Sequence, residues 1–414
     1  MSKRVEPEIE TFARIRVVGV GGSGSNAVNH MINSKVRGVE FLSVNSDAQD
    51  LHRSLSKRKI HIGKNLTRGL GTGMNPELGK RAAEETRQQI QEALQGSDMV
   101  FITCGMGGGT GTGASAVIAK IAKEVGALVI AIVTKPFSFE GAQRKDIAER
   151  GLAELKKEVD AFIVIPNDKL LSVVEKTLSL KQAFALCDEV LREAVEGVSD
   201  IIRTPGDINT DFNDIKAVME GAGPTLMGIG VAEGDERAKE AAQRAVNSPL
   251  LDISISGAKG ILWVVAHSDD LGIMEVHEAS KIISDSVDKN AKIIWGVMKD
   301  DKLKKGQIRI IVIATGFPES AAHASHSATE RSLFSMPAEK REEERGRIYH
   351  EILKRDERTD GELEKVDAQK NSKKQEKEEP IVTATPHKRE NTPPAPEDDE
   401  TWGAIPAFLR RHKK

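Results

Sequence analysis

Two glycine-rich segments, each directly after a short apolar run, constrain the fold of this chain more than any other feature. The apolar run 15–20 leads into segment 19–26, GVGGSGSN, and the run 99–103 leads into segment 105–113, GMGGGTGTG, with a helix expected from Ala114. Glycine lets the backbone approach an anion closely, and a helix N-terminus presents unpaired N–H groups. The two segments therefore predict a polyphosphate site at one edge of an α/β sheet.

The rest of the body has the pattern of an α/β protein. Aromatic residues make up only 4% of the chain, so the core is expected to consist of Val, Ile, Leu and Ala. A long amphipathic helix is predicted over 178–202, because its apolar residues recur with the helical period. A Rossmann-like parallel sheet is predicted from further strands at 41–44, 128–133 and 162–165, and a second, smaller α/β domain from helices near 233–247 and 273–287 and strands at 261–266, 293–298 and 308–314.

Composition divides the chain into a body, a tether and a tip. Between residues 337 and 400 about half of the residues are charged and under a fifth are apolar, which is typical of disordered segments. Apolar side chains return only near the C-terminus. The predicted parts are a flexible extension 1–13, a phosphate-binding domain 14–176, a central connecting helix 177–203, a C-terminal domain 204–317, a disordered charged linker 318–398 and a C-terminal peptide 399–414.

Charge, hydropathy and cysteine content exclude several classes of protein. The chain has 60 Lys+Arg against 63 Asp+Glu, whereas nucleic-acid-binding domains are usually strongly basic, so no nucleic-acid partner is expected. The apolar run 127–133 is far shorter than the roughly 20 residues of a membrane span, and the N-terminus lacks the apolar core of a secretory signal. Cys104 and Cys187 have no CxxC partner, and His323 and His326 have no companion ligands, so no metal site is predicted. The cytoplasm is the expected compartment.

The first glycine segment alone leaves the ligand open. It satisfies G-x-G-x-x-G between a strand and a helix, and Asp47 follows about 20 residues on, as in dinucleotide-binding folds, so an NAD enzyme is one alternative. The second segment adds the hydroxyls of Thr110 and Thr112 to its glycines. No G-x-x-x-x-G-K-[ST] motif occurs, and Gly79-Lys80-Arg81 is the closest approach. The site is therefore expected to bind phosphate without a P-loop lysine.

The motifs together resemble the tubulin/FtsZ superfamily of GTPases, and the body from about 14 to 317 resembles its bacterial cell-division branch. The signature loop of that family matches GGGTGTG at 107–113. Ser23 and Ser25 interrupt a loop that is often all Gly and Asn in relatives, and Lys135 replaces a usual Arg. The other matching segments are SVNSDAQ at 43–49, LTRGLGTGMNPELG at 66–79, KPFSFEG at 135–141, VIPND at 164–168, NTDFND at 209–214, LMGIG at 226–230, SPLL at 248–251, ATGF at 314–317 and IPAFLRR at 405–411.

The resemblance implies that 14–176 binds GTP or GDP, with Mg²⁺ accompanying the nucleotide, and that 204–317 is a GTPase-activating domain. Asp188 lies on the apolar stripe of the long helix, where it would read guanine; an exposed edge position or an internal Arg pair is the alternative. Glu140 and Arg144 would face the ribose and phosphates, or form a surface ion pair. Asn26 would approach guanine, cap a helix, or do both. The implied nucleotide-binding residues are Gly21, Gly22, Ser23, Gly24, Ser25, Asn26, Gly107, Gly108, Gly109, Thr110, Gly111, Thr112, Gly113, Glu140, Arg144 and Asp188.

The segment 209–214 is a candidate catalytic loop, although Asn, Thr and Asp also suit a plain helix start. In the family Asp211 and Asp214 position or polarise the attacking water and Asn209 assists. Because this segment follows the long connecting helix, it should emerge at the end opposite the glycine segments. Catalysis is then expected between subunits stacked head to tail, a non-closing contact that generates a filament.

The C-terminal peptide carries apolar residues after a long polar spacer, which favours a linear motif that orders on binding over a frayed end. In relatives the peptide binds membrane-anchoring and regulatory division proteins; the corresponding residues are Ile405, Pro406, Phe408, Leu409 and Arg410. The function expected is a self-assembling GTPase of the division ring, in the cytoplasm at mid-cell, without a membrane span of its own. A structural polymer that hydrolyses GTP poorly is the remaining alternative.

Overall fold

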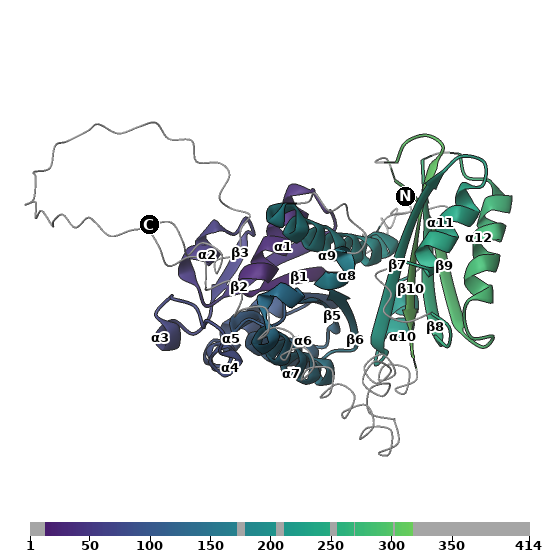
Figure 1. The fold of residues 1–414 in the computed structure, drawn as a ribbon. Helices are drawn as coiled ribbons and strands as arrows, with labels where there is room; N and C mark the ends of the chain where they lie inside the picture. The colour runs from purple at the N-terminus through teal and green to yellow at the C-terminus, as the bar shows by residue number, and fades with distance from the viewer. Residues whose placement is uncertain are drawn as a thin grey trace, which may run out of the picture. The chain divides into compact units, whose positions relative to one another are not determined.

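The computed structural model describes residues 13–171, 179–203, 211–248, 255–268, 270–300 and 303–317. The strands of this part form one ten-stranded sheet in the order β3-β2-β1-β4-β5-β6-β7-β10-β8-β9 (Figure 1). Several predicted features lie outside the described residues. They are nearly all of the N-terminal extension, Asn209, His323, His326, the charged linker and the C-terminal peptide with Ile405, Pro406, Phe408, Leu409 and Arg410.

The N-terminal half of the sheet is parallel, because each strand is followed by a helical crossover. Its strands are β1 (Ile15–Val20), β2 (Val39–Asn45), β3 (Arg58–His61), β4 (Met99–Gly105), β5 (Leu128–Lys135) and β6 (Ala161–Pro166). The helices of this half are α1 (Gly21–Asn33), α2 (Ala48–Arg53), α3 (Lys64–Thr67), α4 (Pro76–Glu85), α5 (Arg87–Leu94), α6 (Thr110–Glu124), the short 3₁₀ helix η1 (Ser138–Glu140), α7 (Ala142–Glu158) and α8 (Asn167–Leu171).

The predicted long helix is α9 (Leu180–Arg203), and the elements after it form the second α/β half. Within the described residues, no helix combines the length and hydropathy needed to cross a membrane. The α/β fold with a parallel sheet, a long connecting helix and a second α/β part is confirmed. The second half consists of α10 (Phe212–Met219), β7 (Gly223–Glu233), α11 (Arg237–Val246), β8 (Gly260–His267), α12 (Ile273–Asp285), β9 (Lys292–Lys299) and β10 (Gln307–Thr315).

One apolar core includes α9 and both halves of the sheet. Leu191 and Val195 of α9 are buried in the same cluster as Ile163 of β6, Leu262 of β8 and Ile313 of β10. Aliphatic residues dominate this cluster, as the low aromatic content predicts. The connecting helix is therefore part of the core rather than an exposed linker, and its burial stabilises both halves together.

Strand β7 was not predicted from the sequence, since its GPTLMGIGVAE segment is rich in glycine, a weak strand former. Tertiary packing explains the glycines. A Cβ atom on Gly228 would clash with the carbonyl oxygen of Ala245, and one on Gly230 with that of Ala241. Both carbonyls belong to α11, so the two glycines let that helix lie directly on the strand. The helix predicted near 233–247 accordingly starts later, at Arg237.

We expect Gly230→Ala to destabilise the protein by about 1–3 kcal/mol, because the clash is with a helix backbone that cannot move aside. Urea unfolding measures the change. Gly197→Ala in α9 is the matched control, since its Cβ would meet only the side chain of Ile311, with Cδ1 at 3.1 Å and Cγ2 at 3.5 Å. An unchanged midpoint for Gly230→Ala would contradict the packing explanation for β7.

Candidate functional site

The two glycine segments each end in a helix N-terminus at the carboxyl edge of the parallel sheet. Helix α1 begins at Gly21, directly after β1, and α6 begins at Thr110, after a loop at 106–109. Both helices start earlier than predicted, since glycines 21–24 and 111–113 lie within their first turns. Neither helix receives a side-chain cap from its N-cap residue. Their first N–H groups can therefore donate hydrogen bonds to an anionic ligand.

The glycines allow these two helix starts to pack against each other. A Cβ on Gly21 would lie 2.9 Å from the backbone nitrogen of Gly111, and Gly21 has φ +71°. A Cβ on Gly24 would clash with the carbonyl of Thr103. By contrast, a Cβ on Gly108 would meet no protein atom within 4 Å. The first glycines hold the two segments together, while Gly108 borders open space where a ligand could lie.

The threonine hydroxyls of the second segment are engaged by the protein. Thr110 Oγ1 lies 2.6 Å from Ser46 Oγ and 2.8 Å from Thr72 Oγ1, and Thr112 Oγ1 accepts a hydrogen bond of 2.9 Å from Gly107 N. Both threonines are buried. Their contacts fix the loop conformation, so the loop offers a ligand mainly backbone N–H groups.

The acidic residues after β2 are held by contacts within the protein. Asp47 caps α2, with Oδ1 accepting from Gln49 N at 2.9 Å and Asp50 N at 3.1 Å. Sequence reasoning missed Asp50, which is buried and accepts from Asn45 Nδ2 at 2.8 Å. Its Oδ2 is 3.1 Å from the position of a Cβ on Gly22, so this carboxylate lies against the first glycine segment. No sequence pattern indicated its burial.

Asp188 lies on α9, which contacts α1. It retains partial exposure, yet the surrounding protein removes enough water from the carboxylate to raise its pKa to about 7, while the nearby His30 acts in the opposite direction. The alternative of an internal Arg partner is not observed for Asp188 among the described residues. Asn26 lies in the second turn of α1 and is half-buried, so the helix-cap interpretation of Asn26 is wrong.

Glu140 and Arg144 are closer to the protein interior than a surface pair would be. Glu140 Oε2 lies 3.6 Å from Arg144 Nη1, and their side chains are only 7% and 18% exposed. Burial raises the pKa of Glu140, although the N–H of Phe137 and the charge of Arg144 oppose this shift. The i, i+4 ion pair of the alternative therefore forms, but it is partly buried rather than at the surface.

A second feature that the sequence did not reveal is a polar link between α1 and α9. His30 Nε2 lies 2.7 Å from Glu189 Oε2, and this bond is the main cause of a raised His30 pKa. Glu189 also accepts from Arg192, and the two partners lower its pKa to about 2. Arg192 in turn pairs with Glu196. This chain of charges fixes the helix that carries Asp188 against the helix that carries Asn26.

The candidate catalytic segment lies at the opposite end of the parallel strands from the glycine segments. Strand β7 pairs with the first residues of β6, Ala161 with Gly223, and Gly223 N donates to Asp160 O at 2.8 Å. Helix α10 comes just before β7, so it lies where the parallel strands begin. Asp211 and Asp214 are exposed, and Asp211 Oδ1 caps the helix by accepting from Asp214 N at 2.8 Å. A six-residue strand spans about 20 Å, so one chain cannot bring these carboxylates to its own glycine segments.

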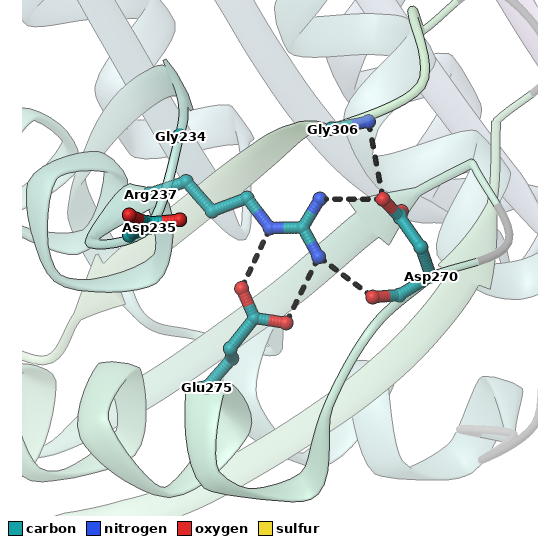
Figure 2. Close-up of a pocket in the computed structure, with 6 residues that line it drawn as sticks. All are labelled: Gly234, Asp235, Arg237, Asp270, Glu275 and Gly306. Carbon is teal, nitrogen blue, oxygen red and sulfur yellow. Dashed lines mark hydrogen bonds and ion pairs between the residues drawn. The ribbon is translucent and has the colours of Figure 1, made fainter.

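A recess in the second half is a rival candidate site. Figure 2 shows Arg237 between Glu275 and Asp270, with Gly234, Asp235 and Gly306 around it; the recess has a volume of about 360 Å³. Arg237 donates to Glu275 at 2.6 Å and 2.9 Å, and to Asp270 at 2.9 Å and 2.7 Å. Gly306 N donates to Asp270 as well. Since the charges of Arg237, Glu275 and Asp270 are already paired, we interpret the recess as a structural contact that joins the loops after β7, β8 and β9.

Comparison with known proteins agrees with this geometry. The model of the tubulin/FtsZ family GTPase domain matches residues 14–175, and that of the FtsZ family C-terminal domain matches 223–318. An empty FtsZ dimer from M. jannaschii is 46% identical, with a TM-score of 0.71, covering 74% of this chain and 89% of that one. A mutant of the same FtsZ has the same identity and TM-score and is covered to 92%. The fold is shared with CetZ2 from Haloferax volcanii, a GTPγS-bound protofilament at 22% identity and a TM-score of 0.65, covering 77% and 98%.

The nucleotide of this family is GTP, so the NAD alternative is wrong. The expected bacterial origin stays a prediction, since the FtsZ structures at 46% identity come from M. jannaschii. With family models on both halves and nearly half of its aligned residues identical to a solved FtsZ, the chain belongs to the FtsZ branch of the tubulin/FtsZ family and is a GTPase.

Proposed function

We propose that this GTPase assembles head to tail into filaments of a cell-division ring and hydrolyses GTP between neighbouring subunits. The observation that carries the proposal is the separation of the two parts of the site. The glycine segments lie at the carboxyl ends of the parallel strands, and Asp211 and Asp214 lie exposed at the opposite end of these strands. Stacking two copies in the same orientation brings these ends together. FtsZ from M. jannaschii is solved as a dimer and CetZ2 as a protofilament, which supports self-association.

The same geometry supports a role for each part of the nucleotide pocket. The N–H groups at the starts of α1 and α6 and of the Gly107–Gly109 loop would bind the phosphates. Asp188 would accept the N1–H and N2–H groups of guanine, and Asn26 would contact the base from α1. Glu140 and Arg144 would bind the ribose and phosphate region. The domain boundaries at 14–176, 177–203 and 204–317 are part of this proposal.

Hydrolysis in this proposal depends on groups from both subunits. The incoming Asp211 and Asp214, with Asn209, would orient and polarise a water for in-line attack on the γ-phosphate. Mg²⁺ would neutralise charge on the phosphates. The described residues hold no cluster of three or more His, Cys, Asp or Glu side chains suited to a metal. Phosphate oxygens and water would therefore supply most of its ligands, and Asp50, against Gly22, is placed to hold one such water.

We expect GTP affinity to rise between pH 6 and pH 8. Guanine would favour the ionised form of Asp188, whose pKa of about 7 in the free protein must fall on binding, so binding releases a proton. Below the pKa the affinity should fall by up to about tenfold per pH unit. The folding stability of the free protein should show the opposite trend: the stability that the raised Asp188 pKa contributes should be present below about pH 4 and be lost as the pH rises through about 7.

Calorimetric titration in buffers of different ionisation enthalpy measures this proton release. Asp188→Asn should weaken GTP binding and abolish the pH dependence. Asp146→Asn, an exposed position on α7, is the control and should change neither. Unaltered proton release in Asp188→Asn would show that another group reads guanine.

We expect Asp214→Ala to bind GTP and assemble normally but to hydrolyse it about 100-fold more slowly or worse, as for loss of a general acid–base group. Phosphate release and sedimentation measure the two properties. Asn213→Ala, an exposed neighbour on the same helix turn, is the control.

In the parent protein, GTPase activity per molecule should rise with protein concentration, because the site is completed by a second subunit. Constant activity on wide dilution would contradict a site shared between subunits, and negligible turnover would favour the structural-polymer alternative.

The proposed cellular role places the filaments in the cytoplasm at the division site, tethered through the C-terminal peptide. The peptide would bind membrane-anchoring and regulatory division proteins through its apolar residues and Arg410. We expect Phe408→Ala to weaken adaptor binding by tenfold or more, at about 1.4 kcal/mol per tenfold, with GTPase activity unchanged. Thr401→Ala is the control in a pull-down with purified adaptor. Lost GTPase activity with intact adaptor binding would reverse this assignment.

A further inference from the structure

The segment that contains the outer strand of the N-terminal half carries a concentrated positive charge that the GTPase site does not use. From Leu51 to Pro76 the sequence contains six Lys or Arg residues and no Asp or Glu. The whole chain carries a net charge of −3, so the remainder carries −9 and this segment has the opposite sign. We call Arg53, Lys57, Arg58 and Lys59 the basic edge. All four are exposed.

Arg58 and Lys59 of the basic edge lie on β3, while Arg53 ends α2 and Lys57 lies in the turn before the strand. Strand β3 is the first in the sheet order and pairs with β2 alone among the described strands. Two of its cations are held by neutral oxygens: Arg58 donates to the carbonyl of Ala93 at 3.2 Å, and Lys59 to that of His52 at 2.9 Å. Within the described part of the chain, no carboxylate forms an ion pair with any of the four. Leu55, which is 51% exposed, follows Arg53 in the turn between α2 and β3.

Protection of a sheet edge is the simplest explanation of lysines on an edge strand, because like charges prevent two copies from pairing. The same physics makes the edge selective. It repels a second copy of itself, yet a strand with negative side chains would gain both backbone hydrogen bonds and charge neutralisation. The other edge strand, β9, differs: it exposes Ile293 and Trp295 together with Lys292 and Lys299.

We propose that the basic edge binds an acidic, extended peptide segment of a partner protein, which adds to β3 as a further strand. This occupant uses every feature of the surface. The unpaired side of β3 supplies main-chain donors and acceptors, the four cations supply charge complementarity, and Leu55 supplies an apolar contact. A lipid surface or a nucleic acid would use the cations but not the strand. The inference does not depend on the proposed filament or on the nucleotide.

The test is fluorescence anisotropy on the full chain with GDP, at about 100 mM salt, where charges more than about 10 Å apart are screened. The probes are labelled octapeptides: alternating Glu and Val, the same peptide with two valines changed to proline, and alternating Lys and Val. Proline keeps the charge but removes strand donors. The Glu/Val peptide should bind at least tenfold more tightly than either of the others.

Lys57→Glu with Lys59→Glu should weaken binding of the Glu/Val peptide at least tenfold. Lys304→Glu with Lys305→Glu, exposed positions of equal charge change in the second half, should alter it less than twofold. Lys57→Ala with Lys59→Ala repeats the test without new charges, and thermal unfolding verifies that each variant is folded. Equal binding of the proline peptide, no loss in the edge variants, or tighter edge-dependent binding to anionic vesicles or single-stranded DNA would overturn the proposal.

Discussion

The close approach of two helix N-termini is the constraint on which the rest of this protein depends. Helices α1 and α6 start beside each other, with Gly21 so near Gly111 that no larger residue fits. Two sets of unpaired N–H groups thus point to one edge of the sheet, where a triphosphate can be held without a lysine. The buried hydroxyls of Thr110 and Thr112 fix the loop between β4 and α6, so the protein folds this anion site in advance.

The direction of the strands then determines what a single chain can do. The carboxyl ends of the parallel strands all lie on one side of the molecule. The pairing of β6 with β7 puts α10 on the opposite side, where the strands begin. The nucleotide pocket and the exposed carboxylates of α10 are thereby separated by the length of a strand. Covalent connectivity alone cannot close this distance. In the proposed filament, an assembly with one orientation throughout would close it at every contact, so polymerisation and hydrolysis would depend on the same geometry.

Helix α9 links the pocket to the second half of the molecule. Its apolar face shares a core with both halves, while its polar residues hold α1 through the bond from His30 to Glu189. Asp188 lies next to Glu189, so the carboxylate proposed to read guanine is positioned by the same network. Desolvation disfavours the ionised form of Asp188 in the free protein. A ligand with two N–H donors would stabilise that ionised form by hydrogen bonding to it.

Much of the fold and of the candidate site was predictable, because the relevant signals are local. Strand, glycine turn and helix follow one another along β1–α1 and β4–α6, and the period of α9 is visible in its apolar residues. Strand β7 was missed, since its glycines are explained only by the carbonyls of α11. The starts of α1 and α6 were predicted too late, since the glycines in their first turns are likewise explained only by contacts with distant residues, such as Gly21 with Gly111.

The sequence by itself determined the class of site and the family, because glycine turns, hydrophobic period and family motifs are properties of short segments. The residues of the pocket stay a prediction. Only the tertiary structure decided how individual side chains are used. It directs Thr112 into the loop, buries Asp50 against Gly22, draws Glu140 and Arg144 inward and joins His30 to Glu189. These outcomes depend on contacts between residues far apart in the chain, and no local pattern specifies which distant groups will meet.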